Sequence, residues 1–150
     1  MRKASMVIMF LILATIANAQ KPEDSIKASV NNFFIGMATS DSIAIINSFT
    51  DGGMLQSVSE KDGKTNVETE KLIDFAHAIA GLQRNDADER IAFNLIKIDG
   101  ALAFVWAPYN FFYKGKFSHC GVDCFAMVRM NGAWKIQYII DTRRKNACKY

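Results

Sequence analysis

The residues best suited to chemistry lie in one stretch of the chain, Phe117 to Phe125. It holds one of the chain's two histidines, two of its three cysteines and an aspartate in an apolar setting. Because side chains alternate between the two faces of a strand, His119 and Asp123 are expected on one face and the cysteines on the other. Histidine titrates near neutral pH, and an apolar setting shifts the pKa of a carboxyl group. Asp123 and His119 are therefore candidates for an acid–base pair or for ligand anchors.

Structural roles for both residues stay open. On a straight strand they lie roughly 13 Å apart, at ~3.3 Å per residue, unless Gly121 lets the strand bend. Asp123 could be a structural carboxylate bonded to Trp106, His119 or Tyr138, and His119 a satisfied histidine at the rim of a pocket. One histidine and one aspartate are too few ligands for a metal site, so neither a metal nor another cofactor is expected.

The three cysteines divide into a pair and a single residue. Cys120 and Cys124 lie four apart on one strand, too far for a disulfide with each other. Cys148 lies in a tail long enough to turn back to Cys120, so we expect a Cys120–Cys148 disulfide with Cys124 free. A nucleophilic cysteine is the rival interpretation, but His119 points to the other face and cannot activate it.

The first residues resemble an export signal. Two basic residues, Arg2 and Lys3, precede an apolar run that ends in the small-residue motif Ala17-Asn18-Ala19. This pattern is typical of a secretory signal peptide, and the run is too short for a membrane span. We therefore expect cleavage after Ala19, removal of residues 1–19, no membrane span in the mature chain, and a secreted or periplasmic location. Residues 20–150 are expected to form one domain.

The composition fits one domain and argues against nucleic acid. Half of the 150 residues are apolar, which is enough for a core, and the formal net charge is only +3. Lysine and arginine are not concentrated in one helix or stripe. Nucleic-acid binding is therefore not expected.

The hydrophobic pattern predicts helices first and strands afterwards. Apolar residues at helical spacing predict a helix over 23–39, a short helix after Asp41, and a third over roughly 67–82. Asp24 or Ser25 is expected to cap the first helix. Strands are predicted over 54–58, 91–98, 101–113, 116–130 and 134–143. The last four should form an antiparallel meander, so the fold class is α+β.

The turns between the last strands predict which side chains share a face. Asp99-Gly100, Lys114-Gly115 and Asn131-Gly132 are each expected to form a two-residue hairpin turn. Counting outward from each turn places an aromatic set beside Asp123, under the helices. Pro108 is a site where a bulge would swap the facing of the next residues. The expected ligand-binding residues on this face are Trp106, Tyr109, His119, Asp123, Phe125 and Tyr138.

The opposite face of the sheet is expected to be small and apolar, with Val105, Val122 and Cys124 among its residues. Asp141 and Arg143 are expected on this face too. No helix is left to cover it, and a broad apolar face does not usually stay in water. A homodimer through this outer sheet face is the simplest cover. The remaining partner expected is a small-molecule ligand.

Element order and local motifs together resemble the nuclear transport factor 2-like superfamily, over Glu23 to Arg143. The motifs are Asp123-Cys124-Phe125 and Asn131 to Ile136. In that superfamily a curved antiparallel sheet is wrapped by helices into a cone with an internal pocket. The segments Trp106 to Tyr109 and Ser118 to Asp123 also resemble small secreted bacterial proteins described as lumazine-binding-like.

Ketosteroid isomerase, an enzyme with this fold, offers a further test. Asp123 matches the position of its carboxylic acid, but the position of its tyrosine falls near Phe33, which has no hydroxyl. The position of its catalytic base falls near Leu55 to Ser57, where there is no carboxylate. The isomerase set is therefore not reproduced, and Phe33 is expected to contact a ligand as an apolar side chain.

We therefore expect a secreted or periplasmic protein that binds a small, partly aromatic molecule in the cone. The alternative is an enzyme of the isomerase, dehydratase or hydrolase type that uses Asp123 and His119 as acid and base. A third interpretation is a structural interaction domain with a filled cone.

Overall fold

The computed structural model describes residues 21–148 as three helices and a seven-stranded sheet. The predicted signal peptide, residues 1–19, lies outside the described residues. Within 21–148, no helix is both long and apolar enough to cross a membrane. The chain has an α+β fold in which a curved, mostly antiparallel sheet packs against the helices, as the sequence predicts.

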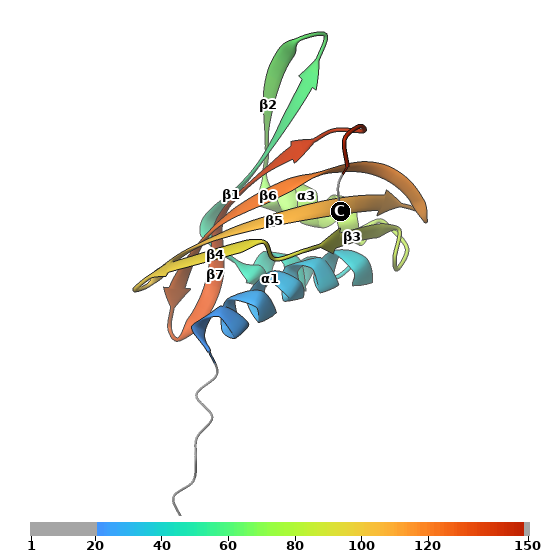
Figure 1. The fold of residues 1–150 in the computed structure, drawn as a ribbon. Coiled ribbons are helices and arrows are strands. Elements are labelled where there is room, and N and C mark those ends of the chain that lie inside the picture. The colour runs from blue at the N-terminus through green and yellow to red at the C-terminus, as the bar shows by residue number, and fades with distance from the viewer. Residues whose placement is uncertain (1–20, 149–150) are drawn as a thin grey trace, which may run out of the picture.

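The helices are α1 (Pro22–Thr39), α2 (Ser42–Ser48) and α3 (Leu72–Ala80). Figure 1 shows α1 lying along one face of the sheet. The start of α1 differs from the prediction, because Pro22 occupies its first turn and Lys21 is the capping position. Asp41 caps α2, its side chain accepting a hydrogen bond from the Ala44 N–H at 2.9 Å. The apolar face of α1 is buried through Ile26, Val30, Phe33, Phe34 and Met37.

The strands are β1 (Phe49–Lys61), β2 (Lys64–Glu70), β3 (Ala87–Ile91), β4 (Leu95–Asp99), β5 (Leu102–Tyr113), β6 (Lys116–Met130) and β7 (Ala133–Arg143). Their order in the sheet is β2-β1-β7-β6-β5-β3, and β4 also pairs with β5. All neighbours are antiparallel except β1 and β7, which are parallel. The β1–β2 hairpin extends away from the body of the protein (Figure 1).

Three predicted elements are wrong in extent. The strand expected over 54–58 and the start of the helix expected over 67–82 form the β1–β2 hairpin instead. The strand expected over 91–98 is split into β3 and β4, which pair with different halves of β5. Pro108 lies at this split and leaves its register with Val122 intact. Its missing N–H falls beside the break between β3 and β4, where no ladder donor is required.

The two later hairpin turns are at the predicted positions, but the pairing register of the strands beyond each turn differs from the prediction. Both central residues of Lys114-Gly115 and of Asn131-Gly132 have positive φ, as tight hairpin turns require. A bulge then shifts β6 by one residue at Ser118, and another shifts β7 at Gln137. The first hairpin closes around Gly100-Ala101 rather than Asp99-Gly100, since Asp99 pairs with Leu102.

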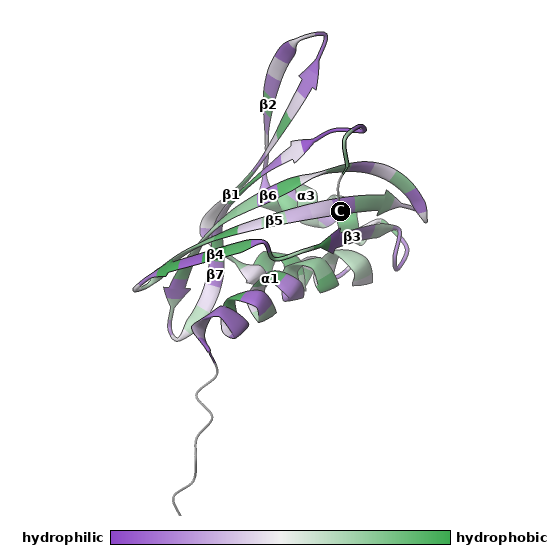
Figure 2. Ribbon diagram, viewed as in Figure 1, coloured by the Kyte–Doolittle hydropathy of each residue, from purple (hydrophilic) through white to green (hydrophobic). Residues whose placement is uncertain are grey.

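These bulges reverse part of the predicted facing, because a one-residue slip moves every later side chain to the other face. Trp106 and Tyr138, expected beside Asp123, lie on the outer face; Trp106 is 38% exposed and pairs with Cys124. Val105, expected on the outer face, is fully buried in the core. Val122 lies on the same face as Cys124, as expected, and is 7% exposed. In Figure 2 apolar residues are spread along β5 and β6, which is consistent with two apolar faces.

Candidate functional site

A cavity of about 50 Å³ lies between the helices and the inner face of the sheet. Its apolar wall comes from α1, β1, α3 and β7, and consists of Phe33, Met37, Leu55, Phe75 and Ile139. Its polar wall comes from β3, β5, β6 and β7, and consists of Glu89, Tyr109, His119, Asp123, Asp141 and Arg143. A site with one apolar half and several converging polar groups is typical of ligand sites in proteins.

Asp141 is the carboxylate of this wall that accepts hydrogen bonds from several side chains. It accepts hydrogen bonds from the Tyr109 hydroxyl at 3.0 Å, the Ser57 hydroxyl at 2.6 Å and Arg143 Nε at 2.9 Å. Burial acts to lower the pKa of Arg143, but the charge of Asp141, its hydrogen bond and the smaller effects of Tyr109 and Glu89 together raise that pKa. Burial and the neighbouring carboxylates raise the pKa of Tyr109 well above its usual range. Tyr109 is therefore a neutral donor, and Arg143 is committed to Asp141.

Gly121 makes this arrangement sterically possible. A Cβ atom at this position would lie 1.6 Å from the Thr142 carbonyl oxygen and 2.8 Å from Tyr109 Cε1. The absent side chain lets the tyrosine ring cross β6, and the Tyr109 hydroxyl also donates to the Thr142 carbonyl at 3.0 Å. Gly121 is thus required because β7 and Tyr109 come too close to β6 to leave room for a side chain at this position.

Asp123 and Glu89 form a carboxyl pair on the opposite side of the cavity. Asp123 is 4% exposed, and no hydroxyl or N–H group of residues 21–148 donates to its Oδ2. The two side chains are within hydrogen-bonding reach of each other. Two carboxyl groups can bond in this way only when one of them carries a proton. Asp123 and Glu89 therefore share at least one proton when the pair is closed.

Burial is the main cause of the proton affinity of this pair. It raises the pKa of Glu89 to about 8, with Asp141 adding to the rise while the bond from Asp123 and the charge of Arg143 oppose it. Burial also raises the pKa of Asp123 well above its ordinary value, helped by the negative charges of Glu89 and Asp141. Like charges in one cavity cannot all ionise near neutral pH.

His119 lies at the edge of the same cavity and is neutral at physiological pH. Burial lowers its pKa, and the charge of Arg143 adds to this. Its ring stands edge-on to Tyr109, with ring centres 5.7 Å apart, and tilted against Phe111 at 5.0 Å. Its Nδ1 is 3.0 Å from the Ser118 hydroxyl. This is a partly packed histidine that still presents a face to the cavity.

The structure brings together some of the predicted site residues and separates others. Phe33, Tyr109, His119 and Asp123 all line the cavity. Phe125 lies on the inner face but is buried against the Phe34 ring of α1, with ring centres 6.0 Å apart. Trp106 and Tyr138 lie on the outer face, where the Tyr138 hydroxyl donates to Gln56 at 2.5 Å. Neither lines this cavity.

Three polar residues of the cavity are absent from the prediction: Glu89, Asp141 and Arg143. Asp141 and Arg143 were expected on the outer face, and the bulge at Gln137 turns them inward. Glu89 was hidden in a charged run, yet its place between Ala87 and Ile91 on an alternating strand could have indicated an inward side chain.

The cysteines lie behind β6, on the side away from the cavity. Cys120 and Cys148 form a disulfide, and Cys124 is free among the described residues. The tail that carries Cys148 is held by paired backbone hydrogen bonds between Cys120 and Arg144, each 2.9 Å long. Burial raises the pKa of the Cys124 thiol, which disfavours the reactive thiolate.

One larger hollow on the surface carries less chemistry. It has about 550 Å³ and lies between α1, α2 and the β6–β7 turn. Among the residues that the structure describes, the only ionisable side chain lining it is Lys135, whose ammonium group already donates to the Asn47 carbonyl. The cavity around Asp123 is therefore the stronger candidate despite its small volume.

Comparisons with known proteins bear on the fold. No protein-family model matches the chain, and no curated protein sequence matches it. Solved structures do match. An NTF2-like protein of unknown function from Shewanella baltica superposes with a TM-score of 0.63 at 16% identity, over 83% of this chain and 94% of that one.

Two further structures agree. A protein of unknown function with a cystatin-like fold from Nostoc punctiforme gives a TM-score of 0.65 at 12% identity, over 83% of this chain and 92% of that one. An NTF2-like protein with a cystatin-like fold from Novosphingobium aromaticivorans gives 0.64 at 12% identity, over 83% of each chain. Similarity at this level of identity establishes architecture and leaves activity open. The chain has the nuclear transport factor 2-like fold that its sequence resembles.

Proposed function

We propose that this chain is an exported protein that binds a small molecule in the cavity around Asp123. The observation that carries the proposal is the buried Oδ2 of Asp123. Apart from the proton shared with Glu89, no donor among the described residues reaches it, and it lies at a cavity whose other half is apolar. A buried polar atom without a partner costs free energy, roughly 1–3 kcal/mol. A ligand that supplies the missing hydrogen bond would recover that cost.

The dimensions indicate that only part of such a ligand is enclosed. Pockets for drug-sized ligands are roughly 300–1,000 Å³, whereas this cavity has about 50 Å³. Arg143, whose side chain is 45% exposed, lines both the cavity and an outer recess of about 450 Å³. We place the head group of the ligand in the cavity and the rest in the recess.

A native mass spectrum of the purified protein tests this proposal first, because it reports any co-purified ligand. Asp123→Asn should then weaken binding of the identified ligand by about tenfold or more, the scale of one charge-assisted contact of ~1.4 kcal/mol. Asp88→Asn is the matched control, because Asp88 lies next to Glu89 on β3 but pairs with Arg90 at the surface. Equal affinity in all three proteins would refute the assignment.

An enzyme using the same cavity is the second candidate. The observation in its favour is that Glu89, with a pKa of about 8, and the neutral His119 line one cavity. A carboxyl group that titrates near neutral pH can act as a general acid or base. Turnover of an identified ligand should then depend on a group titrating near pH 8, and a pH profile unchanged in Glu89→Gln would exclude this role.

Export is supported by the disulfide, since structural disulfides persist mainly in oxidising compartments. We propose that the mature chain begins at Gln20 and is secreted or periplasmic. Sequencing the N-terminus of the protein recovered from its producing cells tests this. A retained Met1 on the folded protein would contradict it.

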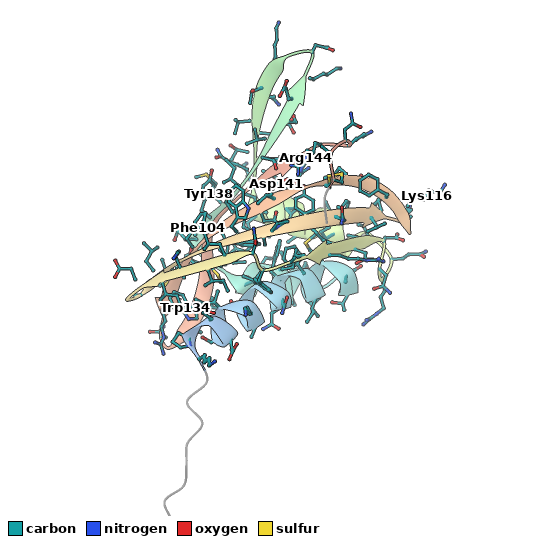
Figure 3. The ribbon with its side chains drawn as sticks, in the orientation of Figure 1. Phe104, Lys116, Trp134, Tyr138, Asp141 and Arg144 are labelled. Atoms are coloured by element: carbon teal, nitrogen blue, oxygen red, sulfur yellow. A yellow bond between two sulfur atoms is a disulfide. The ribbon has the colours of Figure 1, made fainter. Side chains whose placement is uncertain are left out.

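We also propose a homodimer through the outer sheet face. The exposed apolar residues of this face include Leu95 on β4, Leu102, Phe104 and Trp106 on β5, and Met54 on β1. Figure 3 labels Phe104 on β5 and Tyr138 on β7. A second copy presents the same face, so a two-fold axis lets the two surfaces cover each other. Trp106→Lys should give a monomer in analytical ultracentrifugation, and Ile43→Lys, on α2, should not change the mass. A wild-type monomer would refute the interface.

A further inference from the structure

We propose that the cavity selects an organic cation, whose ammonium group docks between Asp123 and Glu89 and displaces a proton from them. This inference rests on the proposed binding function and specifies its ligand class. The ligand is a primary amine with an apolar or mixed tail, and the head group is the part that the cavity encloses.

Acidic side chains outnumber basic side chains around the cavity. Three carboxyl groups line it, from Glu89, Asp123 and Asp141, against a single cationic side chain, Arg143. Arg143 is bonded to Asp141 through both Nε and Nη2. The charge of Arg143 also lowers the pKa of Glu89, but it is the smallest of the four contributions to that pKa. The Asp123–Glu89 pair therefore lacks a cationic partner of its own among the described residues that line the cavity.

The outer recess continues this imbalance. It is lined by Glu68, Glu70 and Asp74 against Lys71 and the shared Arg143. Burial raises the pKa of Glu70, and the negative charge of Asp74 adds to the rise. A cation approaching the cavity through this recess would pass carboxylates at each step, whereas an anion would be repelled.

An ammonium group fits the unmet hydrogen bonding. It carries three donors and no acceptor, and Asp123 Oδ2 is a buried acceptor with no donor among the described residues beyond the proton shared with Glu89. The cavity of about 50 Å³ admits a group slightly larger than one water, which takes ~30 Å³ in the liquid. An ammonium with its first carbon is of this size.

The apolar wall suits an alkylammonium rather than a metal ion. The Phe33 and Phe75 rings stack with centres 6.0 Å apart at the cavity, and aromatic faces attract organic cations. Within residues 21–148, no group of three histidine, cysteine or acidic side chains is arranged to hold a metal ion. Helices α1 and α3 contribute only apolar side chains to the cavity.

Binding of a cation must release a proton, because the pair holds protons at neutral pH. The titratable groups that face the pair are Tyr109 on β5, His119 on β6, and Asp141 and Arg143 on β7. Tyr109 and His119 are neutral near pH 7, and Arg143 offsets Asp141. The proton lost on binding therefore comes from Asp123 and Glu89. Affinity should rise with pH by about tenfold per unit between pH 6 and 8, since one proton is exchanged.

The experiment uses butylammonium as the probe, with 1-butanol and butyrate as neutral and anionic molecules of similar size. ¹³C NMR of the side-chain carboxyl groups follows the protonation of Asp123 and Glu89 during each titration. We expect butylammonium to bind and to shift both carboxyl signals toward their ionised positions. Its affinity should rise about tenfold for each unit of increasing pH. Asp88→Asn should bind identically, and Asp123→Asn or Glu89→Gln should each lose at least tenfold in affinity. Amide replacements remove buried ionisable groups, so both variants are expected to fold.

Two results would overturn the inference. One is preferential binding of 1-butanol or butyrate at the cavity, which would leave a binding site but assign it another ligand class. The other is no binding of butylammonium, or binding that moves neither carboxyl signal. In each case the native mass spectrum of the purified protein still decides separately whether the cavity holds a small molecule.

Discussion

Replacing Glu89 with glutamine should make the fold less sensitive to pH. The pKa of Glu89 lies at about 8 in the folded chain, against an ordinary value of 4.5. At pH values between 4.5 and about 8, Glu89 is ionised in the unfolded chain but protonated in the folded chain. The free energy of unfolding therefore falls as pH rises through this window, and the contribution of the proton is fully present only below pH ~4.5.

The size of the effect follows from the width of the window. Each pH unit is worth 1.36 kcal/mol for one proton, so a shift from 4.5 to about 8 corresponds to a loss on the order of 3–5 kcal/mol. Glutamine has nearly the same shape and no titration. Glu89→Gln should thus match the wild-type stability near pH 4.5 and exceed it by several kcal/mol near pH 8. Its amide can also donate a hydrogen bond to Asp123.

Chemical denaturation at pH 4.5, 6, 7 and 8.5 measures this directly. Trp134 is 5% exposed and reports unfolding by fluorescence, and the disulfide should be kept intact throughout. Asp88→Asn is the control, since its partner Arg90 is exposed and surface ion pairs contribute little, ~0–1 kcal/mol. Parallel stability curves for wild type and Glu89→Gln would refute the argument, because they would show that Glu89 ionises normally in the folded protein.

Two further substitutions test the structure around the site. Gly121→Ala should destabilise the fold by about 3 kcal/mol or more in the same denaturation assay, because its Cβ would overlap the Thr142 carbonyl oxygen. Gly81→Ala is the control, since its Cβ meets nothing closer than 3.5 Å, and a large loss there would undermine the steric argument. Cys148→Ser should cost about 3–4 kcal/mol through the loop it opens, whose ends lie 28 residues apart at Cys120. Adding reductant should erase this difference, and a difference that persists under reduction would show another cause.

The fold was predictable because local signals agreed with the final structure. Lys114-Gly115 and Asn131-Gly132 favour positive φ at adjacent residues, and both turns form where predicted. Asp41 supplies the cap that its position before an apolar helix predicts. Such signals depend on a few neighbouring residues, so they can be recognised without knowledge of the rest of the chain.

The site was only half predictable because its register is set by tertiary structure. The bulges at Ser118 and Gln137 carry no local signature, and an alternating count passes through them without warning. The missed bulges do not affect the prediction that Asp123 and His119 share the inner face, because both lie on one strand. They make the predicted facing of Trp106, on the neighbouring strand, wrong. Residues on one uninterrupted strand keep their relation, and residues across a bulge do not.

The position of β7 in the sheet has a consequence for the order of folding. This strand lies between β1 and β6, and its parallel pairing joins Phe49 to Ile136 across most of the chain. During synthesis the N-terminal hairpin and α1 emerge long before the strand they need, so the sheet stays divided until the C-terminal segment arrives. Long-range pairing of this kind slows folding, because the loop must close before any contact is gained. A chain shortened before β7 should therefore lack the cavity and expose strand edges, so that the arrival of β7 commits the protein to its native state.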